Sequence, residues 1–387
     1  MSEFSDKALL PAGMCDVLPT DAENEAVSME RLIANFSTNG YERVKPPLIE
    51  FEESLLTGSG AAMSGQTFRI MDPVSQRMTG VRADMTLQVA RIATTRLKKS
   101  PRPLRLCYGG QVLRVRGTQM RPERQFGQVG SELIGSSQPQ ADTEIILMAV
   151  EALTNLKITD LSVDLALPTL VPAVIGELNL DGDSAANLRT ALDRKDEAAV
   201  EDLSDQLGEE VTANLAALLR ATGPADSAFA ALEGLDLPKM AESERKSLGT
   251  VIKKIRAAAP DLNLTVDPVE SRGLEYHTGV TFTIFAGGVR GELGRGGRYL
   301  AGGNGTQGEP ATGMSLFMDT VLRAVPTMDP KKRLYIPINT DISQARKLRS
   351  EGWITVDGLA NDADIESDAK RLGCTHYLSD GKITYTN

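Results

Sequence analysis

The sequence predicts an α+β fold in which an antiparallel sheet is flanked by helices, and three observations support this prediction. Two alternating runs, 105–116 and 125–135, are separated by the short segment GTQMRPE, a pattern typical of a β-hairpin. From about residue 175 to 258 the chain is rich in Ala, Leu, Glu and Asp at helical spacing, with almost no strand pattern. Beyond Pro330, short strand and helix patterns alternate, as in a small α/β unit.

These patterns divide the chain into three parts. We expect a mixed domain made of residues 1–174 and 259–329, a helical insertion at 175–258, and a small C-terminal α/β unit at 330–387. The chain has 387 residues, of which 41% are hydrophobic, so it can bury a substantial core in more than one domain.

The first predicted element is a helix that begins near Thr20. Thr20 and Glu23 have the T-x-x-E spacing of a capping box. Apolar residues then recur at helical spacing up to Asn39–Gly40, a pair that suits the left-handed end of a helix. These apolar residues are Met29, Leu32, Ile33 and Phe36.

Strand patterns and a second hairpin follow this helix. Residues 41–47 alternate as in a strand, which the pair Pro46–Pro47 restricts to a sheet edge or a strand end. Residues 66–86 predict a hairpin that turns at Asp72–Pro73, and residues 87–97 predict a helix. The edge strand suits either an ordinary core or a seam between two copies of the chain.

The remaining elements of the mixed domain lie on both sides of the insertion. Residues 141–155 predict an amphipathic helix, and 161–168 and 275–286 predict strands. The Gly-rich run 287–310 lacks the spacing of a phosphate-binding loop or a dinucleotide fingerprint, so it favours hairpin turns over a nucleotide cradle. A helix is predicted at 313–325.

Composition excludes several classes of function. The formal net charge of −10 argues against unaided binding to a polyanion, which needs clustered Lys and Arg. The cysteines, Cys15, Cys107 and Cys374, are isolated and odd in number, which fits a reducing compartment and gives no metal-ligand spacing. The sequence starts without the pattern of a signal peptide, and no apolar run is long enough to span a bilayer. We therefore expect a cytoplasmic protein that binds no membrane.

Polar residues concentrate in the strands of the mixed domain and suggest a small polar pocket. Along 125–135, Gln128, Gly130 and Glu132 share one face of the strand because side chains alternate with a period of two. Carboxylates can accept from a ligand ammonium, while Arg or Gln can hold a ligand carboxylate. The candidates are Asp84, Thr86, Arg114, Gln128, Glu132, Arg272, Glu275, Tyr276, His277 and Arg298. A solvated sheet face, with Asp84 and Thr86 capping a helix, is the competing interpretation. No cofactor or metal is implied, because neither His277 nor His376 has ligand-like neighbours.

A resemblance sharpens this picture. The motifs GMCDVLP, GYERVKPPLIEF, RADMT, RPERQFGQVGSELIG with ADTE, RGLEYHTGVTF, GGRY and ATGMSLFMD occur in the order found in histidyl-tRNA synthetases. They cover most of the chain, and the chain is thereby similar to class II aminoacyl-tRNA synthetases. The resemblance implies their antiparallel sheet flanked by helices, and dimerisation through the first motif, here around Gly40 to Phe51.

Two departures from the synthetase pattern fall where ATP would bind. The second motif keeps Arg114, which the resemblance assigns to an ATP phosphate, but Arg116 stands where a Glu is usual. The third motif ends in Asp319 and Thr320, without the arginine that holds the γ-phosphate. Each lost charge-assisted hydrogen bond costs roughly 1.5–3 kcal/mol. ATP activation should therefore be lost. The C-terminal unit resembles a shortened anticodon-binding domain, so we expect no tRNA binding.

The amino-acid side of the synthetase pocket is kept. By the resemblance, the residues that would bind histidine are Asp84, Thr86, Arg114, Gln128, Glu132, Arg272, Tyr276 and His277. His277 replaces the usual Tyr, and Gly127 replaces the usual His. This combination resembles the regulatory subunits of ATP phosphoribosyltransferase. It implies a non-catalytic chain that joins the short catalytic subunit in a hetero-octamer, is required for its activity, and lets L-histidine inhibit the first step of histidine biosynthesis.

Two other functions remain open from the sequence. One is a working enzyme, either a divergent histidyl-tRNA synthetase or a histidine-adenylating enzyme, which would show histidine-dependent exchange of ATP and pyrophosphate. The other is a histidine sensor with a different partner, which would bind histidine without activating a phosphoribosyltransferase.

Overall fold

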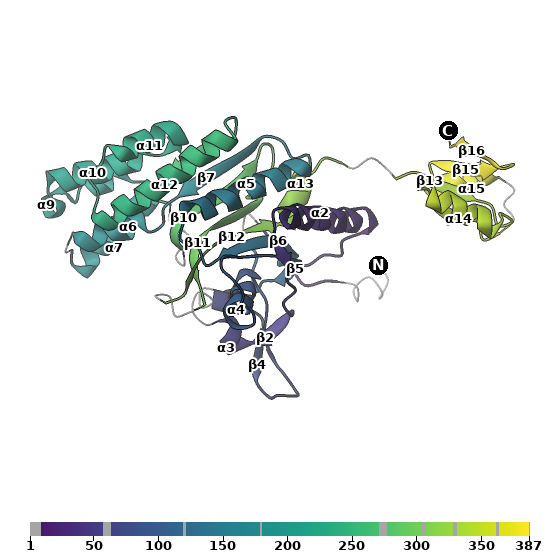
Figure 1. The fold of residues 1–387 in the computed structure, drawn as a ribbon, viewed down its shortest axis with the longest axis horizontal. Helices are drawn as coiled ribbons and strands as arrows, with labels where there is room; N and C mark the ends of the chain where they lie inside the picture. Colours follow the sequence, from purple (N-terminus) through teal and green to yellow (C-terminus); the bar gives the residue numbers. More distant parts are fainter. Residues whose placement is uncertain are drawn as a thin grey trace. The chain divides into compact units, whose positions relative to one another are not determined.

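The structure is a computed structural model that divides into two compact units, Met1–Pro326 and Thr327–Asn387 (Figure 1). The residues it describes are 9–56, 63–118, 121–178, 180–270, 277–302, 307–327, 331–360 and 364–386. Each unit has its own core and is described by itself.

A mixed sheet of nine strands forms the centre of the first unit, in the order β1-β5-β6-β12-β11-β10-β7-β9-β8. Its strands are β1 Glu42–Arg43, β5 Leu104–Leu113, β6 Gln125–Ile134, β7 Leu161–Ala166, β8 Gly223–Pro224, β9 Asn263–Asp267, β10 His277–Ala286, β11 Gly294–Ala301 and β12 Glu309–Phe317. The six strands from β5 to β7 in this order pair antiparallel throughout. The α+β fold with an antiparallel sheet, predicted from the hairpin patterns, is confirmed.

Helices cover both faces of this sheet. α2 (Pro19–Thr38) and α5 (Pro139–Asn155) lie side by side on one face, and α4 (Thr86–Thr95) packs against the other (Figure 1). Because side chains alternate along a strand, β5 contributes side chains to the cores on both faces of the sheet. Cys107 belongs to the core under α2 and α5, and Tyr108 belongs to the core under α4.

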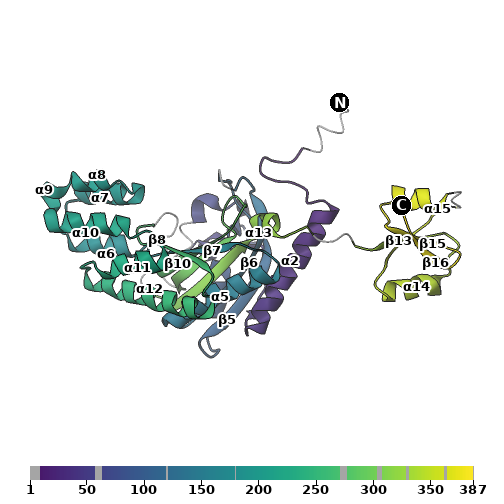
Figure 2. The ribbon, with the colours of Figure 1, turned by 90° about the horizontal axis from the view of Figure 1, so that it is seen from above.

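The insertion is helical, with one two-residue strand, β8, that joins the sheet edge. Its helices gather on one side of the first unit, away from α2 (Figure 2). They are α6 Leu170–Glu177, α7 Gly182–Arg194, α8 Glu197–Glu201, α9 Ser204–Leu207, α10 Glu209–Arg220, α11 Ala225–Glu233 and α12 Lys239–Ala258. The Asp181 and Asp196 side chains cap α7 and α8 by accepting from backbone N–H groups.

A small three-stranded sheet, in the order β2-β4-β3, stands beside the central one. Its elements are β2 Ile49–Phe51, α3 Glu52–Leu55, β3 Arg69–Met71 and β4 Met78–Val81. β3 and β4 form the predicted hairpin, with the turn between Met71 and Met78.

The second unit is a four-stranded sheet with one helix on each face. Its elements are β13 Arg333–Ile336, α14 Ile342–Ser350, β14 Ile354–Asp357, α15 Ile365–Arg371, β15 His376–Ser379 and β16 Lys382–Tyr385. Leu334 and Ile336 pack with α14, while Tyr335 between them packs with α15. The small α/β architecture predicted for this part of the chain is confirmed.

Three details differ from the sequence-based expectations. α2 begins at Pro19 after Leu18, with no side-chain cap, so Thr20 lies inside the first turn and the predicted capping box does not form. The expected strand at 41–47 is limited to Glu42–Arg43. The helix expected from residue 313 begins at Met318 as α13 (Met318–Ala324), because residues 313–317 are buried in β12 between β11 and β6.

Candidate functional site

A connected network of polar side chains lies on the sheet face under α4. Gln128 and Glu132 come from β6, and Ser315 comes from the adjacent β12. Tyr108, on β5, has its hydroxyl within hydrogen-bond distance of Glu132 Oε1 at 3.1 Å, of Ser315 Oγ at 3.2 Å and of Thr86 Oγ1 at 2.9 Å. Four segments that are distant in sequence therefore meet at this tyrosine.

Glu132 is the most deeply buried acid of this network, with none of its surface exposed. The hydroxyl of Tyr108 donates to Oε1 at 3.1 Å and that of Tyr299 donates to Oε2 at 2.8 Å. Burial raises the pKa of the Glu132 carboxyl to about 8, although the hydroxyl donors act in the opposite direction. At neutral pH this site therefore holds a carboxylic acid that is mostly protonated.

Asp84 and Gln128 form the other end of the network. The Gln128 side chain donates from Nε2 to Asp84 Oδ2 at 3.1 Å and to Ser315 Oγ at 2.6 Å, and its Oε1 accepts from the Met85 N–H at 3.0 Å. The Thr86 N–H donates to Asp84 Oδ1 at 2.8 Å. The competing interpretation, in which Asp84 caps a helix, is thus partly right, since Asp84 Oδ1 accepts from the first backbone N–H of α4. The Thr86 hydroxyl instead faces Tyr108.

The structure places the other predicted residues as follows. Arg114 lies just after β5, half-buried, and donates from Nε to the Ala83 carbonyl at 3.3 Å. His277 is buried at the start of β10, opposite Tyr299 of β11. Arg272, Glu275 and Tyr276 lie outside the described residues. Arg298 is not part of the network: its guanidinium holds Asp142 at the start of α5.

Sequence reasoning missed Tyr108, Tyr299 and Ser315. The glycine in β6 is a sequence feature that could have indicated Tyr108. Gly130 lies directly opposite Tyr108, and a Cβ at Gly130 would lie 2.4 Å from the tyrosine hydroxyl oxygen. A Cβ at Gly313 would lie 1.7 Å from Glu132 Oε2. Glycine inside a strand often marks such a close approach, and here both glycines leave room for the network.

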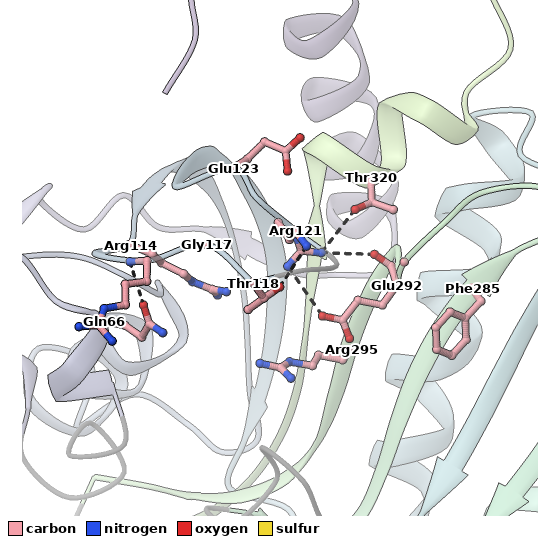
Figure 3. Close-up of a pocket in the computed structure, with 12 residues that line it drawn as sticks. Gln66, Arg114, Gly117, Thr118, Arg121, Glu123, Phe285, Glu292, Arg295 and Thr320 are labelled. Atoms are coloured by element: carbon pink, nitrogen blue, oxygen red, sulfur yellow. Dashed lines mark hydrogen bonds and ion pairs between the residues drawn. The ribbon is translucent and has the colours of Figure 1, made fainter. Parts of the chain in front are cut away.

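A cavity of about 320 Å³ lies next to Arg114, between the β5–β6 connection and β11 (Figure 3). Its lining includes the arginines Arg114, Arg116, Arg121 and Arg295 together with Glu292. This is the part of the chain that carries the second and third motifs.

Arg121 supplies a guanidinium at the place where the third motif lacks its arginine. Arg121 comes from the β5–β6 connection. Its Nε lies 2.8 Å from Asp319 Oδ2 in α13, and its Nη1 lies 3.7 Å from Glu292 Oε1. The guanidinium carbon is 3.9 Å from the centroid of the Phe317 ring. The third motif itself has no arginine at Asp319 and Thr320, as expected, but the fold brings Arg121 to this place from another segment. Asp319 and Glu292 already neutralise the charge of Arg121.

Within the described residues, no group of three or more His, Cys, Asp or Glu side chains could hold a metal ion. None of the described helices is both long and apolar enough to cross a membrane.

Comparisons with known proteins agree with this geometry. A family model described as histidyl-tRNA synthetase matches residues 13–321. An ATP phosphoribosyltransferase regulatory subunit of Rhodospirillum centenum is 56% identical over 97% of this chain and 96% of its own length. The chain belongs to the family of ATP phosphoribosyltransferase regulatory subunits. The recognition from motif order is therefore confirmed.

Solved structures show the same fold. An ATP phosphoribosyltransferase regulatory subunit/histidyl-tRNA synthetase from Bacillus halodurans has a TM-score of 0.81 at 23% identity, covering 96% of this chain and 97% of that one. A chain of the ATP phosphoribosyl transferase (HisG:HisZ) complex from Thermotoga maritima has a TM-score of 0.59 at 19% identity, covering 76% of this chain and 97% of that one. The class II synthetase-like fold predicted from the resemblance is confirmed.

Membership of this regulatory family fits the contrast between the two ends of the site. The described residues around Glu132 form a connected hydrogen-bond network, whereas the motifs that would hold ATP carry Arg116 and the Arg121–Asp319 pair. The chain is a regulatory rather than a catalytic one.

Proposed function

We propose that this chain binds the short-form catalytic subunit of ATP phosphoribosyltransferase, is required for its activity, and lets L-histidine inhibit it. One observation carries the proposal. The described part of the polar network offers hydrogen-bond partners that suit an amino acid, while the third motif lacks its arginine and Arg121 forms an internal ion pair with Asp319. Relatives named as regulatory subunits of this enzyme support the partner.

Histidine is assigned to the old amino-acid pocket. Its ammonium faces the Asp84 and Gln128 end, its carboxylate faces Arg114, and its imidazole faces Tyr108 and Glu132. Because both Glu132 oxygens already accept from tyrosines, the imidazole replaces one of these hydrogen bonds rather than filling an empty position. Thr86, Arg272, Tyr276 and His277 complete the proposed set.

A homodimer through the region around 40–51 is part of the proposal. The small sheet exposes apolar residues next to a cavity of about 700 Å³ lined by Ile49, Ile70 and Met71. Exposed apolar groups clustered on one sheet are typical of a protein interface.

Two catalytic dimers bound to two such dimers would give the predicted hetero-octamer. The mass of the reconstituted complex, measured by light scattering, tests both states, and Ile49→Glu should lower it while Ile354→Glu in the second unit should not.

The histidine assignment is tested in the reconstituted complex. Asp84→Ala should raise the histidine concentration needed for inhibition by about tenfold or more, since a charged hydrogen bond is lost, while subunit assembly persists. Arg189→Gln, on the exposed face of α7, is the matched control. Unchanged inhibition in Asp84→Ala would overturn the assignment.

The alternative of a working enzyme is tested on the isolated chain. Histidine-dependent exchange of ATP and pyrophosphate at an ordinary enzymatic rate would favour a divergent histidyl-tRNA synthetase or an adenylating enzyme. Histidine binding without activation of the catalytic subunit would favour a sensor with another partner. The cytoplasmic location stays a prediction.

A further inference from the structure

We propose that Arg82 is a positioning residue that holds Asp84 in place for the ammonium of a bound amino acid, and that the pocket thereby selects α-amino acids over their hydroxy analogues. The proposal rests on the proposed function, which assigns the histidine ammonium to the Asp84 and Gln128 end of the network. Arg82 acts through the backbone, because its guanidinium donates to main-chain carbonyls and not to the network itself.

The Arg82 side chain joins two segments that are distant in sequence. Arg82 lies between the end of β4 and the start of α4 and is buried, with 7% of its surface exposed. Its Nε donates to the carbonyl of Gln111 in β5 at 2.8 Å, and its Nη1 donates to the carbonyl of Pro46 at 3.0 Å. A guanidinium presents several N–H donors in one rigid plane, so a single side chain can hold both carbonyls.

A glycine in β5 leaves room for this guanidinium. A Cβ at Gly110 would lie 2.5 Å from Arg82 Nη2. Gly110 is directly opposite Gln128 in the register of β5 and β6, and Gln128 is the residue whose amide donates to Asp84. Glycine inside a strand often marks such a close approach. The guanidinium therefore lies against β5 at the register position of the network.

The backbone of residue 82 is fixed as well, and Asp84 follows two positions later. The Arg82 N–H donates to the Leu48 carbonyl at 3.0 Å, and the Arg82 carbonyl accepts from the Leu113 N–H at 3.0 Å. Beyond Asp84, the Thr86 N–H donates to Asp84 Oδ1 at 2.8 Å. Because each residue has only two soft backbone dihedrals, a chain fixed at both ends of this short segment leaves the Asp84 carboxylate little freedom.

Arg82 acts on Asp84 by position rather than by charge. Burial lowers the pKa of the Arg82 guanidinium, and the carboxylate whose charge acts in the opposite direction is Glu50. A lysine keeps the charge but has one ammonium on a flexible stem, so it should hold the two carbonyls poorly. We therefore expect Arg82→Lys to behave more like Arg82→Met than like the parent.

The position of Asp84 decides how well the pocket distinguishes an ammonium from a hydroxyl. A charge-assisted hydrogen bond is roughly twice as strong as a neutral one, but only at the right distance and angle. A hydroxy acid in place of the amino acid makes the neutral bond. Displacement of Asp84 should therefore reduce the preference for the amino acid and leave the rest of the binding in place.

Hydrogen exchange of the ligand-free, full-length chain tests the anchor. The amides of Met85 and Thr86 donate to side chains of the network, and in Arg82→Met they should exchange about tenfold faster or more. Arg102→Met is the matched control, since the Arg102 guanidinium also holds backbone carbonyls, but near the other end of α4. Unchanged exchange in Arg82→Met, or an equal increase in Arg102→Met, would overturn the anchor.

Calorimetric titration with L-histidine and with imidazolelactate, in which a hydroxyl replaces the ammonium, tests the selection. Arg82→Met should raise the dissociation constant of histidine about tenfold or more and that of imidazolelactate less than about threefold. Gly110→Ala keeps the guanidinium but pushes it aside, so it should act in the same direction and carries the test if Arg82→Met fails to fold.

Two outcomes separate this proposal from the proposed function. Equal losses for the two ligands in Arg82→Met and Gly110→Ala, or equal affinities in the parent, would overturn the selection by Asp84. A parent chain that binds neither ligand would reject the proposed histidine pocket, while the exchange rates of Met85 and Thr86 would still decide whether Arg82 is the anchor.

Discussion

The two adjacent parts of the site treat charge in opposite ways. In the network around Glu132, the carboxylate oxygens each accept a tyrosine hydroxyl, and the acid is mostly neutral because burial raises its pKa to about 8. In the cavity beside it, Arg114, Arg116 and Arg295 form no ion pair with a described carboxylate, although Glu123 and Glu292 also line the cavity. The first region is closed by hydrogen bonds to a neutral acid, whereas the second gathers charged side chains of both signs.

The difference also supports the proposal that this synthetase-like chain has lost ATP binding and kept histidine binding. The histidine side depends on side chains that share one sheet face, so cross-strand packing holds them in place. The nucleotide side depends on single arginines at segment ends, where Arg116 and Asp319 can replace the usual residues without disturbing the sheet. Binding to the first region can survive while activation at the second is lost.

The largest expected effect comes from the buried ion pair between Arg121 and Asp319, which lies at the second and third motifs. Arg121→Gln leaves Asp319 buried without its cation, and breaking one partner of a buried pair costs about 3–5 kcal/mol. We expect a fall of this size in the free energy of unfolding, measured by urea denaturation. The double variant Arg121→Gln/Asp319→Asn should recover much of the loss. An equal free energy of unfolding in the single variant and the parent would show that the Arg121–Asp319 pair does not stabilise the fold.

Glu132→Gln should stabilise the chain at alkaline pH. The carboxyl has a pKa of about 8 in the folded chain, above the roughly 4.3 of an unfolded Glu, so its favourable contribution is complete below pH 4 and is lost as the pH rises toward 8. Gln cannot ionise and escapes this loss. We expect the variant to exceed the parent by a few kcal/mol at pH 9 and to match it near pH 4. Glu201→Gln, on the exposed end of α8, should show no such divergence.

Gly313→Ala tests whether the network needs the space that this glycine leaves. The added Cβ would lie 1.7 Å from Glu132 Oε2, so either the carboxylate or the β12 backbone has to move. Overpacking of this kind costs about 1–3 kcal/mol. We expect a corresponding loss in thermal stability together with weaker histidine binding. Gly176→Ala, where an added Cβ meets nothing within 4 Å, is the control.

The pH dependence of histidine binding sharpens the comparison, because burial raises the pKa of Glu132 to about 8. Below pH 8 the protonated acid can pass its proton to a bound neutral imidazole, so binding takes up no proton. Above pH 8 the ionised acid needs a proton from solvent, and below about pH 6.5 free histidine has to lose one. The dissociation constant should therefore be lowest between these values, and it should rise up to tenfold per pH unit below them. It should rise more steeply at high pH, where the ammonium of free histidine also loses its proton. A flat profile from pH 6 to pH 10 would place the imidazole elsewhere.

Much of the fold was predictable from local patterns. The β5–β6 hairpin, the helical insertion and the alternating elements of the second unit all follow from periodicity and turn residues. The segment 313–317 was not predictable, because a short apolar run suits either a helix or a buried strand, and its pairing with β6 and β11 decides. The helix start at Pro19 was missed because a proline at the first helical position competes with the cap signal of Thr20.

The candidate site was predictable only in part, for a related reason. Gln128 and Glu132 share a strand face that the period of two reveals. Tyr108, Tyr299 and Ser315 reach them from other strands, so their roles depend on the register between strands. Arg121 meets Asp319 across 198 positions, which no local pattern encodes.

Tyr299→Phe gives the smallest effect and separates the two tyrosines that hold Glu132. Removing the hydroxyl that donates to Oε2 leaves Tyr108 as the remaining tyrosine donor to the acid. The cost should be about 1 kcal/mol at neutral pH, where the acid is mostly protonated, and larger at pH 9, where an ionised oxygen loses its donor. The same loss should raise the pKa of Glu132 and extend the alkaline limit of histidine binding upward. A limit that stays at the parent value would mean that the Tyr299 hydroxyl does not influence the pKa of Glu132.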